Sequence, residues 1–328
     1  MQEFGWGVIG CGEIANVFAV SLKSLNRGRL VAGASRTPGK AEAFAKRHTI
    51  PRSYSDYDAL LADPEVDIVY ISTTHNFHFE CVKQCLEGGK HVLCEKPFTI
   101  NAEQTRRLAA LAKEKNLFVM EALWTRFLPA ILKLQELIAS GEIGTVETLY
   151  TNFCLGFDLP PEHRMRNIDL AGGALLDLGI YPISMADIIF GEKPSRFSSF
   201  ATMDRETGVD EHSHYVLEFG DRKKALLSSS YSQAAPKDAI VSGTKGYIRV
   251  PDFLAAQELH IHKTDAEPEV LRFPYGESEN FKYEIAHVMD CVEAGLRESN
   301  VMPLSKTLEI MELMDAIRKP WKLVYPGE

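Results

Sequence analysis

A lysine at residue 96 has the type and setting that proton transfer requires. Lys96 follows the apolar run 91–94 and precedes Pro97, and a proline cannot continue a strand ladder. Held at the end of a strand, such a lysine can carry a proton or act as a positive charge that lowers the pKa of a neighbour. Taken alone, a lysine is more often a surface residue than a catalytic one, so its setting needs further support.

A carboxylate and a phenol supply that support in the second half of the chain. The pattern of residues 173–190 predicts one helix, on which Asp177 and Tyr181 are four residues apart and share a face. The rest of this helix is almost entirely apolar, so both polar groups need a partner or a function. The alternative interpretation is structural, with the tyrosine hydroxyl bonded to a backbone carbonyl.

A glycine-rich segment near the start of the chain predicts a dinucleotide site. Residues 4–9 are an apolar run, and the sequence Gly10-Cys11-Gly12-Glu13-Ile14-Ala15 follows it and continues into an amphipathic helix. Gly10 permits a sharp turn, and Gly12 has no Cβ to block a pyrophosphate. The free N–H groups and positive end of the helix would then face the anion, with Glu13 and Ile14 beside it. A structural turn that binds nothing is the alternative.

The end of the second expected strand indicates which dinucleotide binds. Residues 30–34 form a short apolar run that ends at Ser35 and Arg36, and no acidic residue stands there to bond the ribose 2′-hydroxyl of NAD. Arg36 and Lys40 instead offer positive charge where the 2′-phosphate of NADP would lie. We therefore predict NADP, with NAD possible, whereas the alternative makes Arg36 a solvated charge.

Polar residues at the ends of two more strands are expected to complete the cofactor site. The strand predicted at 66–71 is followed by Thr73, His75 and His78, at the edge of a parallel sheet where ligands bind. Packing or capping at the start of the helix over 79–86 is an equal alternative for the histidines. Glu95 and Lys96 end the next strand and are expected to face the nicotinamide half. The strand–helix alternation closes near Ala122, which predicts one α/β dinucleotide-binding domain.

Composition restricts the classes of partner. The chain has 328 residues, 45% of them hydrophobic, and a net charge of −9. This balance disfavours nucleic acid or an anionic membrane and favours a small molecule. No uninterrupted apolar stretch of about 18 residues and no charged-then-apolar leader occur, so a cytoplasmic protein is expected. The six cysteines contain no C-x-x-C pair, which predicts reduced thiols and no metal site.

The second half of the chain has a different pattern. Trp124, Arg126 and Phe127 lie in an aromatic and cationic crossing segment that could bind a ring-shaped polyol, although core packing of the two aromatics is equally possible. From residue 195 onward, alternating strands and short turns predict a largely antiparallel sheet. The helix over 173–190 would cover one face, and a second copy of the chain would cover the other, which predicts a homodimer.

Three segments together resemble the Gfo/Idh/MocA oxidoreductase family. They are residues 10–15, the sequence Glu95-Lys96-Pro97, and residues 172–181; further matches lie at 121–127, 206–210, 242–246 and 303–305. Within the family, the chain is most similar to the dimeric dihydrodiol dehydrogenase branch, which includes NADP-dependent D-xylose dehydrogenases. The resemblance implies an N-terminal Rossmann domain, a doubly wound parallel sheet over 1–122. It also implies a C-terminal α/β domain over 123–328, whose large open, mostly antiparallel sheet forms a dimer or a dimer of dimers.

The resemblance also implies roles for site residues. Lys96 and Tyr181 would be the catalytic pair, with Asp177 beside them, and we expect Phe153 to join Trp124, Arg126 and Phe127 in binding the substrate. Many relatives carry histidine at the position of Tyr181, and the tyrosine favours the branch of dihydrodiol, xylose and glucose–fructose oxidoreductases. Trans-dihydrodiol or D-xylose dehydrogenase activity is therefore the expected function.

The expected chemistry is reversible hydride transfer between a hydroxyl-bearing ring carbon and C4 of nicotinamide. Tyr181 would take the hydroxyl proton, with the Lys96 cation lowering the phenol's pKa from about 10. The roles could also be exchanged, with neutral Lys96 as the base. Two further alternatives remain: a keto- or anhydro-sugar reductase of the same family, and a non-catalytic NADP-binding regulator.

Overall fold

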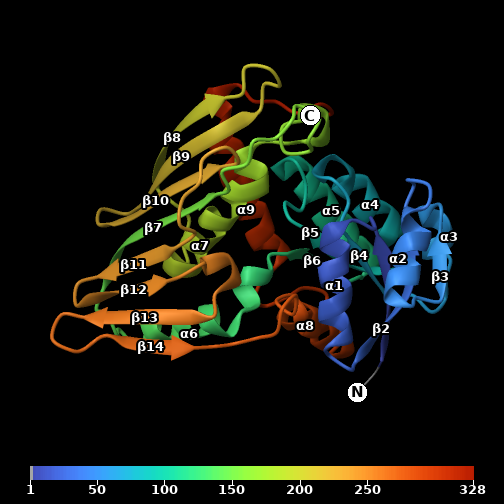
Figure 1. The fold of residues 1–328 in the computed structure, drawn as a ribbon, viewed down its shortest axis with the longest axis horizontal. Helices are drawn as coiled ribbons and strands as arrows, with labels where there is room; N and C mark the ends of the chain where they lie inside the picture. Colours follow the sequence, from blue (N-terminus) through green and yellow to red (C-terminus); the bar gives the residue numbers. More distant parts are fainter. Residues whose placement is uncertain (1–2) are drawn as a thin grey trace. The chain divides into compact units, whose positions relative to one another are not determined.

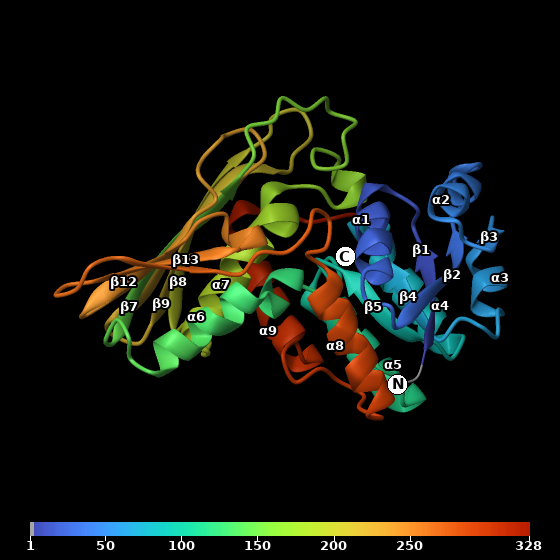
Figure 2. The ribbon, with the colours of Figure 1, turned by 60° about the horizontal axis from the view of Figure 1, so that its bottom comes forward.

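The computed structural model describes residues 3–328, and their contacts divide the chain into two units (Figures 1 and 2). The first unit runs to Trp124 and also includes residues 276–308. The second unit comprises residues 125–275 and 309–328. The sequence division placed its boundary after residue 122 and assigned everything beyond it to one domain. The return of residues 276–308 to the first unit is a feature that the linear division does not contain.

A six-stranded parallel sheet forms the centre of the first unit. Its strand order is β3-β2-β1-β4-β5-β6, and every neighbouring pair is parallel. This is the doubly wound order in which ligands bind beyond the carboxyl ends of the strands, and it confirms the predicted Rossmann sheet. The strands are β1 (Phe4–Ile9), β2 (Gly28–Ala34), β3 (Arg52–Tyr54), β4 (Ile68–Ile71), β5 (His91–Glu95) and β6 (Val119–Ala122).

Helices flank this sheet and bury its apolar residues. The ring of Phe18 stacks on that of Tyr70 in β4 with centroids 3.9 Å apart, so the first helix is fixed against the sheet centre. A late helix, α8, packs against α1 within the same unit. The helices are α1 (Glu13–Lys23), α2 (Lys40–His48), α3 (Tyr57–Leu61), α4 (His75–Glu87), α5 (Ala102–Lys115) and α8 (Lys282–Glu293).

An eight-stranded sheet forms the second unit. Its order is β14-β13-β12-β11-β7-β10-β9-β8. Strands β7 and β10 pair in parallel, whereas the other neighbours are antiparallel, which confirms the predicted mostly antiparallel sheet. The strands are β7 (Val146–Cys154), β8 (Arg196–Met203), β9 (Asp210–Phe219), β10 (Lys223–Ser230), β11 (Ala239–Gly243), β12 (Gly246–Val250), β13 (Glu258–Lys263) and β14 (Glu269–Arg272).

The helix predicted over 173–190 is built in two parts. It begins as a π-helix, Leu175–Gly179, and continues as α7 (Ile180–Phe190), so its first turn is wider than an α-turn. The segment Ile168–Phe190 is long and apolar enough to cross a membrane by length and composition, but 89% of its most apolar window is buried inside the fold. It is therefore the core helix of this unit, where it contacts β7 and β10. Helix α6 (Pro129–Ala139) also contacts α7, and α9 (Leu304–Arg318) spans the division between the units.

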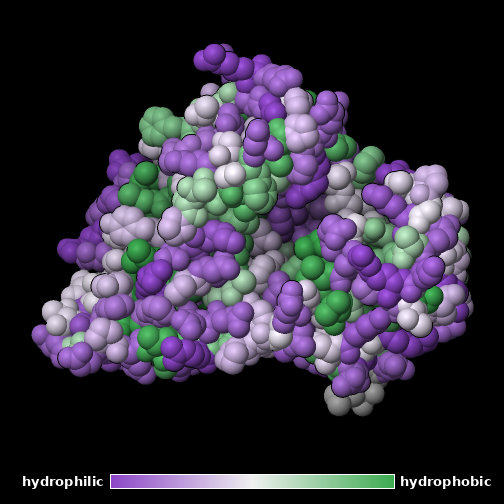
Figure 3. Space-filling view, viewed as in Figure 1, coloured by the Kyte–Doolittle hydropathy of each residue, from purple (hydrophilic) through white to green (hydrophobic). Residues whose placement is uncertain are grey.

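The opposite face of the eight-stranded sheet carries a row of apolar side chains. Cross-strand register aligns Val216, Leu226, Tyr150 and Ile240 on neighbouring strands, and we call these four residues the outer stripe. Leu226 is 39% and Tyr150 47% exposed, whereas the residues that alternate with them are buried. On the face drawn in Figure 3, hydrophobic areas are separated by hydrophilic residues.

Candidate active site

The glycine-rich loop after β1 has a backbone shape that requires glycine. Gly10 has a φ of +92°, and a Cβ at this residue would lie 2.7 Å from the carbonyl of Ser72. Ser72 Oγ donates to the Gly10 carbonyl at 2.7 Å, and the Gly10 N–H donates to Ala34 O at 3.1 Å. The loop is thus fixed between the carboxyl ends of β2 and β4.

The start of α1 has the properties of an anion site. Gly12 precedes the helix in extended conformation, and no side chain caps the helix N-terminus. A Cβ at Gly12 would meet no atom within 4 Å, so the space above the loop is open. Glu13 and Ile14 form the exposed first turn beside it. These groups fit the pyrophosphate of a dinucleotide, because uncapped N–H groups and the positive helix end face the open space.

Arg36 is held by aromatic rings at the end of β2. Its guanidinium lies 4.4 Å from the ring centroid of Phe77 and 5.2 Å from that of Tyr57. Ser35 Oγ accepts the Thr37 N–H at 3.2 Å, which shapes the turn. Lys40 is exposed at the start of α2. A cation fixed at this strand end fits a phosphate on the adenosine ribose.

The histidines after β4 are more deeply placed than a lining role requires. His78 is fully buried, with its ring nitrogens 2.8 Å from Pro97 O and 3.1 Å from Thr73 O. Burial lowers the pKa of His78 to about 3, so the ring is neutral and donates one of these bonds. These contacts favour the packing interpretation for His78, which links the loops that follow β4 and β5. His75 is also buried, and its ring centroid is 5.9 Å from that of His78.

A buried carboxylate fixes the turn that carries Lys96. Glu95 is 6% exposed, and its Oε1 accepts the Tyr70 hydroxyl at 2.5 Å. Its Oε2 accepts the Lys96 backbone N–H at 3.2 Å. Lys96 itself is partly exposed. These two bonds fix the backbone that carries Lys96 just after the carboxyl end of β5.

A second buried acid, close enough to feel the charge of Glu95, was missed by sequence reasoning. Glu284 of α8 has no exposed surface, and among the described residues neither of its carboxyl oxygens has a hydrogen-bond partner. Burial, and then the charge of Glu95, raise the pKa of Glu284 well above its ordinary value. The sequence did carry a signal, because Glu284 shares a helix face with the apolar residues Phe281, Ile285 and Val288.

In the second unit, Asp177 and Tyr181 each have a defined neighbour. Asp177 Oδ2 lies 2.8 Å from a guanidinium nitrogen of Arg164, whose side chain is 46% exposed against 2% for the aspartate. Tyr181 is 6% exposed, and the ring of Phe153 lies edge-on to it at 5.6 Å. Arg164 belongs to an irregular loop that sequence patterns do not assign to any role. The second unit thus carries the Asp177 carboxylate, the Tyr181 phenol and the Phe153 ring that contacts this phenol.

The three residues of the crossing segment are buried. Trp124 is 8% exposed and lies 5.5 Å from Phe281, ring to ring. Arg126 is 6% exposed and donates to Ser184 Oγ at 2.9 Å and to Asp187 Oδ2 at 2.6 Å. Phe127 is 5% exposed. These are the contacts of core residues, so the substrate role of the segment stays a prediction.

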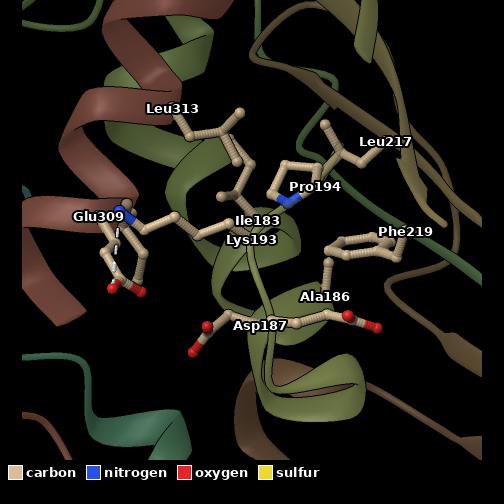
Figure 4. Close-up of a pocket in the computed structure, with 11 residues that line it drawn as sticks. Ile183, Ala186, Asp187, Lys193, Pro194, Leu217, Phe219, Glu309 and Leu313 are labelled. Atoms are coloured by element: carbon tan, nitrogen blue, oxygen red, sulfur yellow. Dashed lines mark ion pairs between the residues drawn. The ribbon is translucent and has the colours of Figure 1, made fainter. Parts of the chain in front are cut away.

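The second unit also contains a small cavity, which Asp177 and Tyr181 do not line. It has a volume of about 30 Å³ and is lined largely by apolar side chains of α7, β9 and α9 (Figure 4). Lys193 at its edge pairs with Glu309 at 3.7 Å. It is too small for a sugar ring. Among residues 3–328, no cluster of three or more histidine, cysteine, aspartate or glutamate side chains is arranged to hold a metal ion.

The strand order, the glycine loop and the open start of α1 define a dinucleotide-binding protein of the Rossmann class. The chain belongs to the GFO/IDH/MocA oxidoreductase family. Residues 4–123 match the family described as "Oxidoreductase family, NAD-binding Rossmann fold", and residues 131–249 match the GFO/IDH/MocA C-terminal domain. The predicted family is thereby confirmed.

The relatives are enzymes. The chain is 37% identical to trans-1,2-dihydrobenzene-1,2-diol dehydrogenase of Mus musculus over 98% of both chains, and 35% identical to that of Homo sapiens over the same shares. A 3-ketoreductase from Actinomadura kijaniata, solved with NADP and TDP-benzene, is 27% identical with a TM-score of 0.86 over 97% of this chain and 98% of that one. An aldose-aldose oxidoreductase from Caulobacter crescentus shares the fold at 24% identity and a TM-score of 0.89, over 97% of each chain. The protein is thus an NAD(P)-dependent sugar or diol oxidoreductase that acts on CH–OH groups.

Proposed function

We propose that this protein is an NADP-linked dehydrogenase of a cyclic trans-diol or an aldose such as D-xylose, in which Lys96 and Tyr181 carry the proton. The observation that carries the proposal is the buried Asp177 and Tyr181 on an apolar helix. A pair that packing alone does not require suggests a chemical role. Similarity to dihydrodiol dehydrogenases over 98% of the chain supports the substrate class.

The cofactor, when bound, supplies the hydride acceptor or donor at its nicotinamide C4. Tyr181 takes the proton of the substrate hydroxyl, and the Lys96 ammonium stabilises the resulting phenolate. Asp177, paired with Arg164, orients the hydroxyl. The edge of Phe153 limits rotation of the Tyr181 ring. The reverse assignment, with neutral Lys96 as base and Tyr181 as donor, uses the same residues.

A substrate panel tests the function. Pentoses, hexoses, inositols and cyclic trans-diols are each offered with NADP, and reduced nicotinamide is followed by its absorbance. Turnover of diols or xylose supports the proposal. Reduction of keto- or anhydro-sugars without oxidation of diols would instead identify the protein as a sugar reductase of the same family. NADP binding without turnover of any compound favours a regulatory protein.

The cofactor preference makes a separate prediction for Arg36. Replacing Arg36 with alanine removes a charged contact to the 2′-phosphate, so KM for NADP is expected to rise about tenfold or more while KM for NAD changes little. Steady-state kinetics with both cofactors measure this. Arg106→Ala, at an exposed site on α5, is the matched control. A clear preference of the unmodified protein for NAD would contradict the proposal.

The open sheet face makes a prediction about assembly. We propose that a second copy covers the outer stripe, because a contiguous row of apolar side chains on an open sheet face is typical of an interface. Light scattering at micromolar concentration is expected to give twice the chain's mass. Leu226→Glu is expected to shift the protein toward monomer, whereas Leu132→Glu, which alters the similarly exposed Leu132 on α6, is not. A monomeric mass for the unmodified protein would refute the dimer.

We also propose that the protein works in the cytoplasm. Its six cysteines are free thiols, and five of them are buried, which agrees with a reducing compartment. Recovery of the protein in the soluble fraction after cell lysis and differential centrifugation is the expected result. Recovery with the membrane pellet would contradict it.

A further inference from the structure

The turn that starts the Asp177 helix is made of bare backbone. Gly173 has a φ of +112°, and a Cβ there would lie 2.3 Å from Asp210 Oδ1 and 3.2 Å from the Tyr325 hydroxyl. A Cβ at Gly172 would lie 2.6 Å from the carbonyl oxygen of Arg164. Atoms of Asp210, Tyr325 and Arg164 therefore pack directly against this turn and leave no room for a side chain at either glycine.

Two buried side chains from distant segments bind the turn. Asp210, at the start of β9, accepts the Leu175 N–H on Oδ2 at 2.7 Å, and Tyr325 donates its hydroxyl to Gly172 O at 2.8 Å. Asp210 is fully buried and Tyr325 is 2% exposed. The Leu175 N–H, at the entry to the π-helix, would otherwise lack an intrahelical partner, and the Gly172 carbonyl belongs to the turn just before it.

Both side chains are themselves held in place. Asp210 Oδ2 also accepts the Ser213 hydroxyl at 3.0 Å. The Tyr325 N–H donates to Glu328 Oε2 at 2.8 Å, and the same oxygen accepts a bond from Arg318 at 2.8 Å. The Arg318 guanidinium lies 5.2 Å from the Tyr325 ring centroid. Bonds between Arg318 and Glu328 thus hold the C-terminal segment 318–328 in place. This segment presents the Tyr325 hydroxyl to the turn at Gly172 and Gly173, which we call the glycine turn.

We propose that Asp210 and Tyr325 are positioning residues for the reaction, which set the placement of Asp177 and Tyr181 by fixing the first backbone groups of their helix. Asp177 follows Leu175 by two residues, and Tyr181 by six. Arg164, which pairs with Asp177, lies against the same turn through its carbonyl. A small shift of the turn therefore displaces the acid, its arginine and the phenol together. This inference rests on the proposed function.

Two conservative variants test it. Tyr325→Phe removes one hydrogen bond and Asp210→Asn alters the other, and each is expected to lower kcat about threefold to tenfold, with KM for NADP unchanged within twofold. The amide of Leu175 is expected to exchange with deuterium about tenfold faster in both variants. Tyr247→Phe, at an exposed position on β12, is the matched control and should change neither quantity.

The two readouts separate the inference from the proposed function. If kcat and the deuterium exchange rate of the Leu175 amide are the same in the variants as in the unmodified protein, the positioning role is overturned. An equal loss of thermal stability in the control and in the variants, with kcat unchanged, would overturn it as well. If the unmodified protein turns over no compound of the panel, the proposed function fails. Faster exchange in the variants would then still support the anchoring of the turn.

Discussion

Replacement of Tyr181 by phenylalanine is expected to lower kcat about a hundredfold or more, and Lys96→Met should have an effect of the same size. Each change removes one group of the proposed proton-transfer pair and leaves the size of the side chain nearly unchanged. Binding of the cofactor should be retained in Tyr181→Phe, because the glycine loop and Arg36 belong to the first unit. Steady-state kinetics with NADP and the best substrate of the panel give the measurement.

A double variant makes this test sharper. If Lys96 and Tyr181 act on the same proton, Lys96→Met/Tyr181→Phe should lose little more activity than either single variant, since residues that act as a unit are strongly non-additive. Multiplicative losses would show that the two groups act in separate steps. Turnover close to that of the unmodified protein in either single variant would remove that residue from the mechanism. Lys113→Met and Tyr247→Phe, both at exposed positions, are the matched controls.

Replacement of Glu284 by glutamine is expected to stabilise the protein, increasingly so as the pH rises. The ordinary pKa of this carboxyl is 4.5, and the folded state raises it, first through burial and then through the charge of Glu95. Between the unfolded and folded pKa values the folded protein holds the proton more tightly. The unmodified protein should therefore lose about 1.4 kcal/mol of stability for each pH unit across that window. Glutamine keeps the shape without the titration.

Denaturant unfolding at pH 5, 7 and 9 measures this difference. The two proteins should be most alike at pH 5 and diverge at pH 7 and 9, with Glu284→Gln the more stable. Glu80→Gln, at an exposed position on α4, should follow the unmodified protein throughout. A stability difference that is independent of pH would show that the pKa of Glu284 is the same in the folded and the unfolded protein.

The local pattern of the sequence determined much of this fold and most of its candidate site residues. The run before Gly10 and the spacing of the glycines predict β1 and the start of α1, because a sharp turn and a close approach to an anion depend on the residues at that turn. Apolar runs ended by polar residues predict the parallel strands, and the alternation after residue 195 predicts the antiparallel sheet. Lys96, Asp177 and Tyr181 were identified because charge or polarity in an apolar segment is visible without a structure.

The tertiary structure decided which partner each polar residue has. Periodicity places Glu284 on the apolar face of its helix, but it does not show that this carboxyl lies near Glu95. No local pattern shows that Asp210 and Tyr325 hold the glycine turn. The same holds for the backbone contacts of His78 and for the pairing of Arg164 with Asp177. Such contacts join segments far apart in the chain, and their geometry follows from how helices and sheets pack. A local pattern contains the polarity of a residue, whereas its partner is set only when the whole core forms.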